Sequence, residues 1–137
     1  MKTLPQVTRE NSADLSFAWA CLLSGTIGME DFTAWAETVV ATMPSDDLPP
    51  YMIDLMMAES HRDLTVGIRD IIGFWPSTDF DAQTQAAFDG VVYLRGAARA
   101  DDVKTPRHKA LAALQQKPDP KDQFTRMFPS LTLDETA

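Results

Sequence analysis

The chain has 137 residues, of which 45% are hydrophobic and 23% are charged, and its net charge at pH 7 is −8. This composition is close to the soluble-protein average and argues against a disordered chain, and no apolar run approaches the ~20 residues that span a bilayer. The shortage of Lys and Arg disfavours binding to nucleic-acid phosphates, which depends on basic side chains. A chain of this length fits one domain, so we expect residues 1–137 to form a single domain.

All of the net charge comes from residues 11–61, the acidic half of the chain. Between Asn11 and His61 there are eight acids and no Lys or Arg, whereas the other residues carry twelve acids and twelve bases. Clustered like charge steers a basic surface into encounter and speeds association, so the natural partner of this half is basic. An acidic helical surface can also serve only to keep a domain soluble, and the sequence leaves both interpretations open.

Helix signals recur in the acidic half, and strand signals are rare. Ser12 is placed to cap a first helix, which Gly25 ends. A second helix begins near Gly28, has two acids in its positive-ended first turn and ends at Pro44. The residues expected on the inward faces of these helices are Leu15, Trp19, Leu22, Leu23, Phe32, Trp35, Ala36, Val39 and Met43.

Residues 46–50 form a rigid acidic connector whose tandem proline opens a helix over 51–59. The side chains expected to point inward from this helix are Ile53, Met56 and Met57. We expect His61 to lie at a helix end, where it favours the C-terminal dipole. A short helix over 65–72 follows, closed by Gly73 and a turn.

The longest predicted helix begins near residues 78–79 and runs towards Ala98. Gly90 and Gly96 weaken it, each by about 1 kcal/mol relative to alanine, and favour close contacts with other helices. Two further helices follow.

Proline marks the start of the last two helices. In each of the dipeptides Thr105-Pro106 and Asp119-Pro120, a capping residue precedes a first-turn proline. The tail at 130–137 is expected to be extended or frayed. The sequence thus predicts an all-α fold, a bundle or orthogonal array of about six to seven short helices.

No residue pattern predicts an enzyme, a cofactor or a metal site. His61 and His108 each lack a second His or Cys at ligand spacing. Cys21 lies within an apolar helix, where a thiol is usually packed and inert. This single cysteine suits a reducing compartment, and the Met1-Lys2 start lacks the apolar core of an export signal, so we expect a cytoplasmic protein.

Two aromatic residues beside prolines are candidates for binding. Tyr51 follows the tandem proline of the acidic connector, and Trp75 precedes Pro76 in a turn. Such residues serve either as interface anchors or as lids folded onto the core, and the sequence allows both roles.

Short segments spread over residues 15–130 carry a family resemblance. They lie at 17–19, 25–27, 32–36, 47–55, 72–74 and 93–96. Their residues resemble those of the small all-helical immunity proteins of bacterial contact-dependent growth inhibition and polymorphic toxin systems. The resemblance implies a protein that binds and neutralises a cognate toxin domain in the cytoplasm.

Resemblance and charge together predict an inhibitor that covers a basic, nuclease-type toxin by stoichiometric occlusion. Nuclease toxins carry basic grooves for phosphate, and an acidic face can occupy such a groove as a phosphate mimic. The residues expected to contact the toxin are Glu37, Asp46, Asp47, Tyr51, Asp54, Glu59 and Trp75. Asp54 has a competing role in capping or bridging helices.

The alternative to a toxin inhibitor is a helical adaptor or scaffold subunit. In that case the acidic surface is only solvated, and the protein has no toxin partner. The sequence does not fix the oligomeric state, the activity of the toxin or the mode of inhibition.

Overall fold

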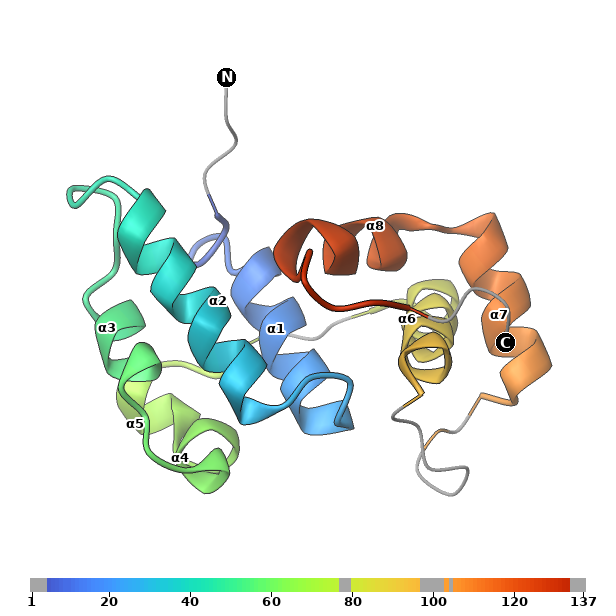
Figure 1. The fold of residues 1–137 in the computed structure, drawn as a ribbon, viewed down its shortest axis with the longest axis horizontal. Helices are drawn as coiled ribbons and strands as arrows, with labels where there is room; N and C mark the ends of the chain where they lie inside the picture. Colours follow the sequence, from blue (N-terminus) through green and yellow to red (C-terminus); the bar gives the residue numbers. More distant parts are fainter. Residues whose placement is uncertain (1–4, 77–79, 97–102, 104, 134–137) are drawn as a thin grey trace. The chain divides into compact units, whose positions relative to one another are not determined.

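The computed structural model describes residues 5–76, 80–96, 103 and 105–133, and these residues form eight α-helices and no strands (Figure 1). The prediction of an all-α fold is therefore confirmed. The chain divides into two compact units: unit 1 comprises residues 1–23 and 27–78, and unit 2 comprises residues 24–26 and 79–137. No helix in the described ranges is both long enough and apolar enough to cross a membrane.

Unit 1 is built from five helices, of which α2 packs on α3, and α5 packs on both α3 and α4. Their bounds are α1 Ala13–Ser24, α2 Met29–Thr42, α3 Tyr51–Met56, α4 His61–Thr65 and α5 Ile68–Ile72; Ser24 itself is grouped with unit 2. The core of unit 1 contains fully buried side chains from all five helices, among them Phe17, Phe32, Met52, Leu55, Leu64 and Ile68.

Local signals set the end of the first helix and the start of the second, as predicted. Gly25 has a φ of +78°, a left-handed conformation that glycine adopts without strain, and it follows the last residue of α1. The backbone N–H of Gly28 donates to the Asp31 carboxylate at 2.9 Å, which fixes the start of α2. The prediction for Leu23 was wrong, because this side chain at the end of α1 is 49% exposed.

The face of α3 that points into the core differs from the face that the sequence predicts. Met52 and Leu55 are fully buried, whereas Ile53 is 42% and Met57 is 68% exposed. The backbone N–H of Met52 bonds the carbonyl of Pro49 at 3.1 Å, so the proline turn sets the rotational phase of a helix only six residues long. The expectation that Ile53 and Met57 point inward was wrong, and Met56 is only half-buried.

His61 begins a helix and does not end one. The Ser60 side chain accepts a hydrogen bond from the Asp63 backbone N–H at 3.1 Å, which makes Ser60 the N-cap of α4. The interaction predicted between His61 and a C-terminal dipole is therefore wrong. Three short helices over residues 51–72 thus replace the two that the sequence predicts.

Unit 2 contains α6 (Ala82–Arg95), α7 (Arg107–Gln116) and α8 (Asp119–Met127), and α6 packs against both other helices. A Cβ atom added to Gly90 would lie 2.7 Å from the Ala110 carbonyl oxygen and 3.0 Å from the Leu114 Cβ. The close helix contact predicted at Gly90 is confirmed.

The ends of α6 differ from the prediction. Asp81 caps the helix by accepting from the Thr84 backbone N–H at 2.7 Å, and Gly96 ends it with a φ of +78°. Gly96 is therefore a helix terminator and not the interior position that we expected. The predicted bounds at Thr78, Asp79 and Ala98 lie outside the described residues.

Prolines stand at the starts of α7 and α8, but each helix begins one residue away from the predicted first residue. Helix α7 begins one residue after Pro106, and α8 begins one residue before Pro120. Pro106 and Pro118 occupy the cap positions themselves, and Pro120 lies within the first turn of α8. The carbonyl of Thr105, the predicted cap, instead accepts the Tyr93 hydroxyl at 2.9 Å. After α8 the Leu131 backbone N–H donates to the Phe128 carbonyl at 3.0 Å in a turn, and residues 134–137 are outside the described part.

Candidate partner-binding surface

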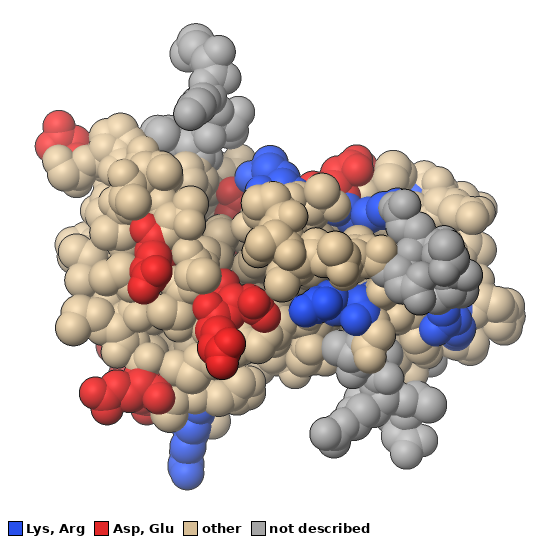
Figure 2. Space-filling view, viewed as in Figure 1, with Lys and Arg blue, Asp and Glu red and all other residues tan. Residues whose placement is uncertain are grey.

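The acidic residues are divided unequally between the two units. Unit 1 contains eleven Asp and Glu against four Lys and Arg, whereas unit 2 contains nine against eight. Figure 2 shows acidic side chains in separate groups over the visible face of unit 1. The charge asymmetry of the sequence therefore follows the structural division of the chain.

Five acids that the sequence singles out form what we call the acidic surface. All five side chains are exposed, and they lie on consecutive elements of unit 1: α2, the loop that follows it, α3, and the residues before α4. They are Glu37, Asp46, Asp47, Asp54 and Glu59. Their exposure leaves each carboxylate available to a partner.

The connector between α2 and α3 is an ordered turn. The backbone N–H groups of Asp47 and Leu48 both donate to the Pro44 carbonyl, at 2.9 and 3.0 Å. Asp46 and Asp47 are exposed within this turn. The turn thus holds two charges in solvent next to the start of α3.

Asp14, although it belongs to the acidic half, takes no part in the acidic surface. It is 2% exposed, and its carboxylate accepts the Gln6 backbone N–H at 2.9 Å. The Asp14 backbone N–H in turn donates to the Gln6 carbonyl at 2.9 Å. Asp14 therefore joins the segment before α1 to the start of that helix.

Tyr51 is integrated into unit 1 at both ends of its side chain. Its hydroxyl donates to the Val7 carbonyl, and its ring meets the Phe74 ring edge-on at a centroid distance of 5.9 Å. Burial, and then the carboxylate of Glu10, raise the pKa of Tyr51. The side chain is half-buried, so it supports the fold in addition to any contact that it makes outside.

Trp75 is mostly exposed, and its ring packs against the ring of Trp19. The residue is 53% exposed, and the centroid of its ring lies 6.1 Å from that of the Trp19 ring in a tilted arrangement. The Trp19 indole N–H donates to the Leu64 carbonyl at 2.9 Å, which fixes the supporting ring. This geometry suits an aromatic anchor more than a lid, because Trp75 remains largely exposed to solvent.

Ile53 and Met57 are surface residues that sequence reasoning missed as candidates for binding. Ile53 lies within α3, and Met57, four residues later, is the C-cap of this helix; the exposed Asp54 follows Ile53 in the sequence. Large apolar side chains at a surface are informative when they gather next to polar groups. The signal that could have found them is the tandem proline, because its turn fixes which face of α3 points outward.

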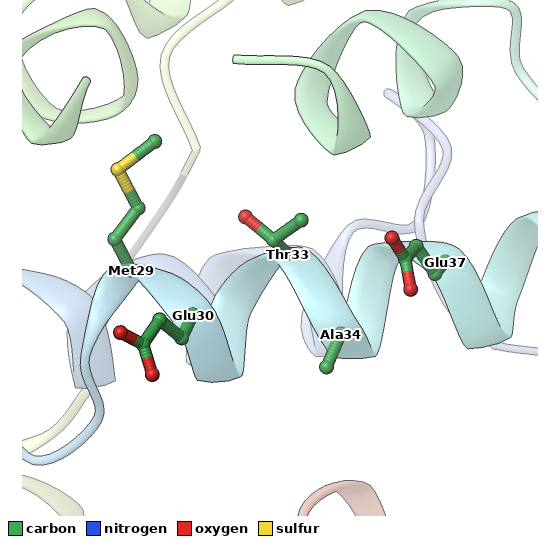
Figure 3. Close-up of a pocket in the computed structure, with 5 residues that line it drawn as sticks. All are labelled: Met29, Glu30, Thr33, Ala34 and Glu37. Atoms are coloured by element: carbon green, nitrogen blue, oxygen red, sulfur yellow. The ribbon is translucent and has the colours of Figure 1, made fainter. Parts of the chain in front are cut away.

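An open hollow lies along α2 and contains one residue of the acidic surface. Its lining residues all come from this helix: Met29, Glu30, Thr33, Ala34 and Glu37 (Figure 3). Glu30 and Glu37 are seven residues apart, which is about 10.5 Å along a helix axis. Both carboxylates are exposed, so they flank the smaller side chains of Thr33 and Ala34.

The one cysteine is packed in the core, as predicted. Cys21 is 0% exposed, and burial raises the pKa of its thiol. A thiol held in this way resists conversion to the reactive thiolate. Within the described ranges, no three His, Cys, Asp or Glu side chains are grouped to hold a metal ion.

Comparisons with known proteins identify no relative: no family model, no curated protein and no solved structure matches this chain. Many residues in the segments on which the family resemblance was based are core positions, such as Phe17, Phe32, Trp35, Leu55 and Ile72. Such positions reflect helix packing more than recognition. Recognition of a partner instead requires exposed residues, such as those of the acidic surface of unit 1.

Proposed function

We propose that this protein is an immunity protein that binds a cognate bacterial toxin domain through unit 1 and neutralises it by covering its active surface. The observation that supports this proposal is the composition of the exposed part of unit 1. The acidic surface occurs there together with the exposed apolar residues Ile53, Met57 and Trp75, on a unit with eleven acids and four bases. Exposed apolar side chains surrounded by charged or polar ones are typical of a surface that binds another protein.

The negative charge of unit 1 favours a toxin that acts on phosphate-containing substrates. A nuclease-type domain needs Lys and Arg to bind phosphates, and the same side chains attract carboxylates. Glu37, Asp46 and Asp47 would pair with such bases at the rim of the groove. Occlusion of this kind needs no chemistry from the inhibitor.

Genomic position and binding test the proposal together. An immunity gene is expected directly after a large toxin gene, so the probe is the C-terminal domain of the protein encoded immediately upstream, called here the upstream domain. Expression of the upstream domain should arrest bacterial growth, and co-expression of this protein should restore it. Titration calorimetry with the purified proteins should then show a tight, stoichiometric complex.

Two results would contradict the proposal. One is a neighbouring gene whose product does not arrest growth. The other is a toxic upstream domain that this protein neither binds nor neutralises. Either result would favour the alternative of a helical adaptor or scaffold subunit with a solvated acidic face.

A further inference from the structure

The outward side of α3 combines apolar and acidic groups on a firmly held helix. We call Ile53 and Asp54 of α3, together with Met57 at its C-cap, the α3 face. Ile53 and Met57 are 42% and 68% exposed, while Met52 and Leu55 on the other side of the helix are fully buried. Because α3 packs on α2 and α5 and buries Met52 and Leu55, the α3 face is presented in a fixed orientation.

We propose that the α3 face is the apolar contact that holds the toxin domain in the complex, and that its occupant is a basic protein surface with an apolar centre. This inference rests on the proposed function, because it names the part of unit 1 that makes the decisive contact. Ile53 and Met57 would lose water on binding, and burial of apolar area slows dissociation.

Charge complementarity identifies the occupant as basic. Asp46 and Asp47 precede the α3 face along the chain, Glu59 follows it, and all three are exposed. No Lys or Arg occurs between Asn11 and His61, so no base of this segment neutralises these acids. A partner with Lys or Arg around an apolar centre would satisfy both parts of the surface.

The same charges disfavour other occupants. A second copy of this chain would bring two acidic surfaces together, and each copy carries a net charge of −8. Like charges placed opposite each other across an interface disfavour the complex. Anionic lipid and nucleic-acid phosphate would be repelled for the same reason.

The acidic and the apolar groups are expected to act at different stages of binding. The acids act over distance and set the rate of association, which falls as salt screens them. Ile53 and Met57 act only after docking and set the rate of dissociation. A variant of the α3 face should therefore change the dissociation rate and leave the association rate nearly unchanged.

The test is stopped-flow mixing of the upstream domain with four proteins: the parent, Met57→Ser, the double variant Ile53→Ser with Met57→Ser, and the control Leu23→Ser. Leu23 is similarly exposed, at 49%, but lies at the end of α1. The double variant should dissociate at least about tenfold faster than the parent, as expected for an apolar anchor. Met57→Ser should give part of this effect, and Leu23→Ser should bind as the parent does.

The outcomes separate this inference from the proposed function. If the parent does not bind the upstream domain, the proposed function fails. If the parent binds and the double variant binds equally well, the α3 face is not the contact, although the proposed function stands. Met57 is 68% exposed, so Met57→Ser alone should fold normally by circular dichroism and keep the test decisive.

Sedimentation of the protein alone provides a second check. The parent should remain monomeric in high salt, where screening removes the repulsion between acidic surfaces. A dimer of the parent that the double variant abolishes would identify a second copy as the occupant and overturn the inference.

Discussion

The hydroxyl group of Tyr51 donates a hydrogen bond to the backbone carbonyl of Val7, which lies 44 residues earlier in the chain. Tyr51 is the first residue of α3, and Val7 is fully buried in the segment before α1. The bond therefore ties the N-terminal segment to the helix that presents Ile53 and Met57. The Phe74 ring packs against the Tyr51 ring from the turn after α5 and holds it in place.

Replacement of Tyr51 by phenylalanine should lower stability without abolishing binding. The Tyr51→Phe variant keeps the ring against Phe74 but leaves the buried Val7 carbonyl without its donor, which should cost about 1–2 kcal/mol in the free energy of unfolding. Urea unfolding followed by circular dichroism measures this loss. An unchanged free energy of unfolding would show that the hydroxyl does not bond Val7 in solution.

Stability should also depend on alkaline pH through Tyr51. Because its pKa is raised in the folded protein, the unfolded phenol loses its proton first, from about pH 10. The contribution of Tyr51 is therefore fully present below that pH and is lost as the pH rises through the folded pKa. From pH 8 to 11 the parent should lose stability more steeply than Tyr51→Phe, and parallel curves would disprove this linkage.

Gly90→Ala should destabilise the protein despite the better helix propensity of alanine. Alanine alone would add about 1 kcal/mol to helix stability, but its methyl group would clash with the Ala110 carbonyl of α7 and cost about 1–3 kcal/mol. Gln83→Ala, at an exposed position of α6, is the matched control. Thermal unfolding of both variants provides the comparison, and a stabilised Gly90→Ala protein would mean that α6 and α7 are not in close contact.

Cys21 should react slowly with thiol reagents in the folded protein. The side chain is fully buried and its pKa is raised, so little thiolate is available at neutral pH. Reaction with Ellman's reagent should be slow in buffer and complete within the mixing time in concentrated urea. Rapid reaction in buffer would show that this part of α1 opens readily to solvent.

Short-range chemistry made much of the fold predictable. Gly25 and Gly73 end helices because each adopts a left-handed conformation after the last turn. Pro44 follows α2, and Gly90 occurs where two helices approach. The exposure of Asp46 and Asp47 was also predictable, because acids between prolines rarely have a reason to be buried.

Long-range packing decided the features that the sequence did not reveal. The inward face of α3 depends on Met52 and Leu55 reaching the core, and six residues are too few for periodicity to show this. The bond between Tyr51 and Val7 joins residues 44 positions apart. Asp14 is buried because its partner is the backbone of Gln6, a contact that no spacing rule predicts.

We propose that the acids on unit 1 guide a basic partner, and the effect of their location can be tested separately from that of net charge. Asp46→Lys with Asp47→Lys reverses two exposed charges in the connector of unit 1, where substitutions usually change stability within about 0.5 kcal/mol. Asp119→Lys with Asp122→Lys makes the same change in net charge on exposed positions of α8 in unit 2. The α8 pair lies in a helix first turn and should cost about 0.3–1 kcal/mol per residue, so circular dichroism must confirm that both variants are folded.

The most direct measurement is the association rate of each protein with the upstream domain, obtained by stopped flow at low and at high salt. The connector variant should associate about tenfold more slowly than the parent at low salt and show a weaker dependence on salt, whereas the α8 variant should stay within about threefold of the parent. Equal association rates for the parent and the connector variant at every salt concentration would contradict the account, because the acidic connector would then be only a solvated loop.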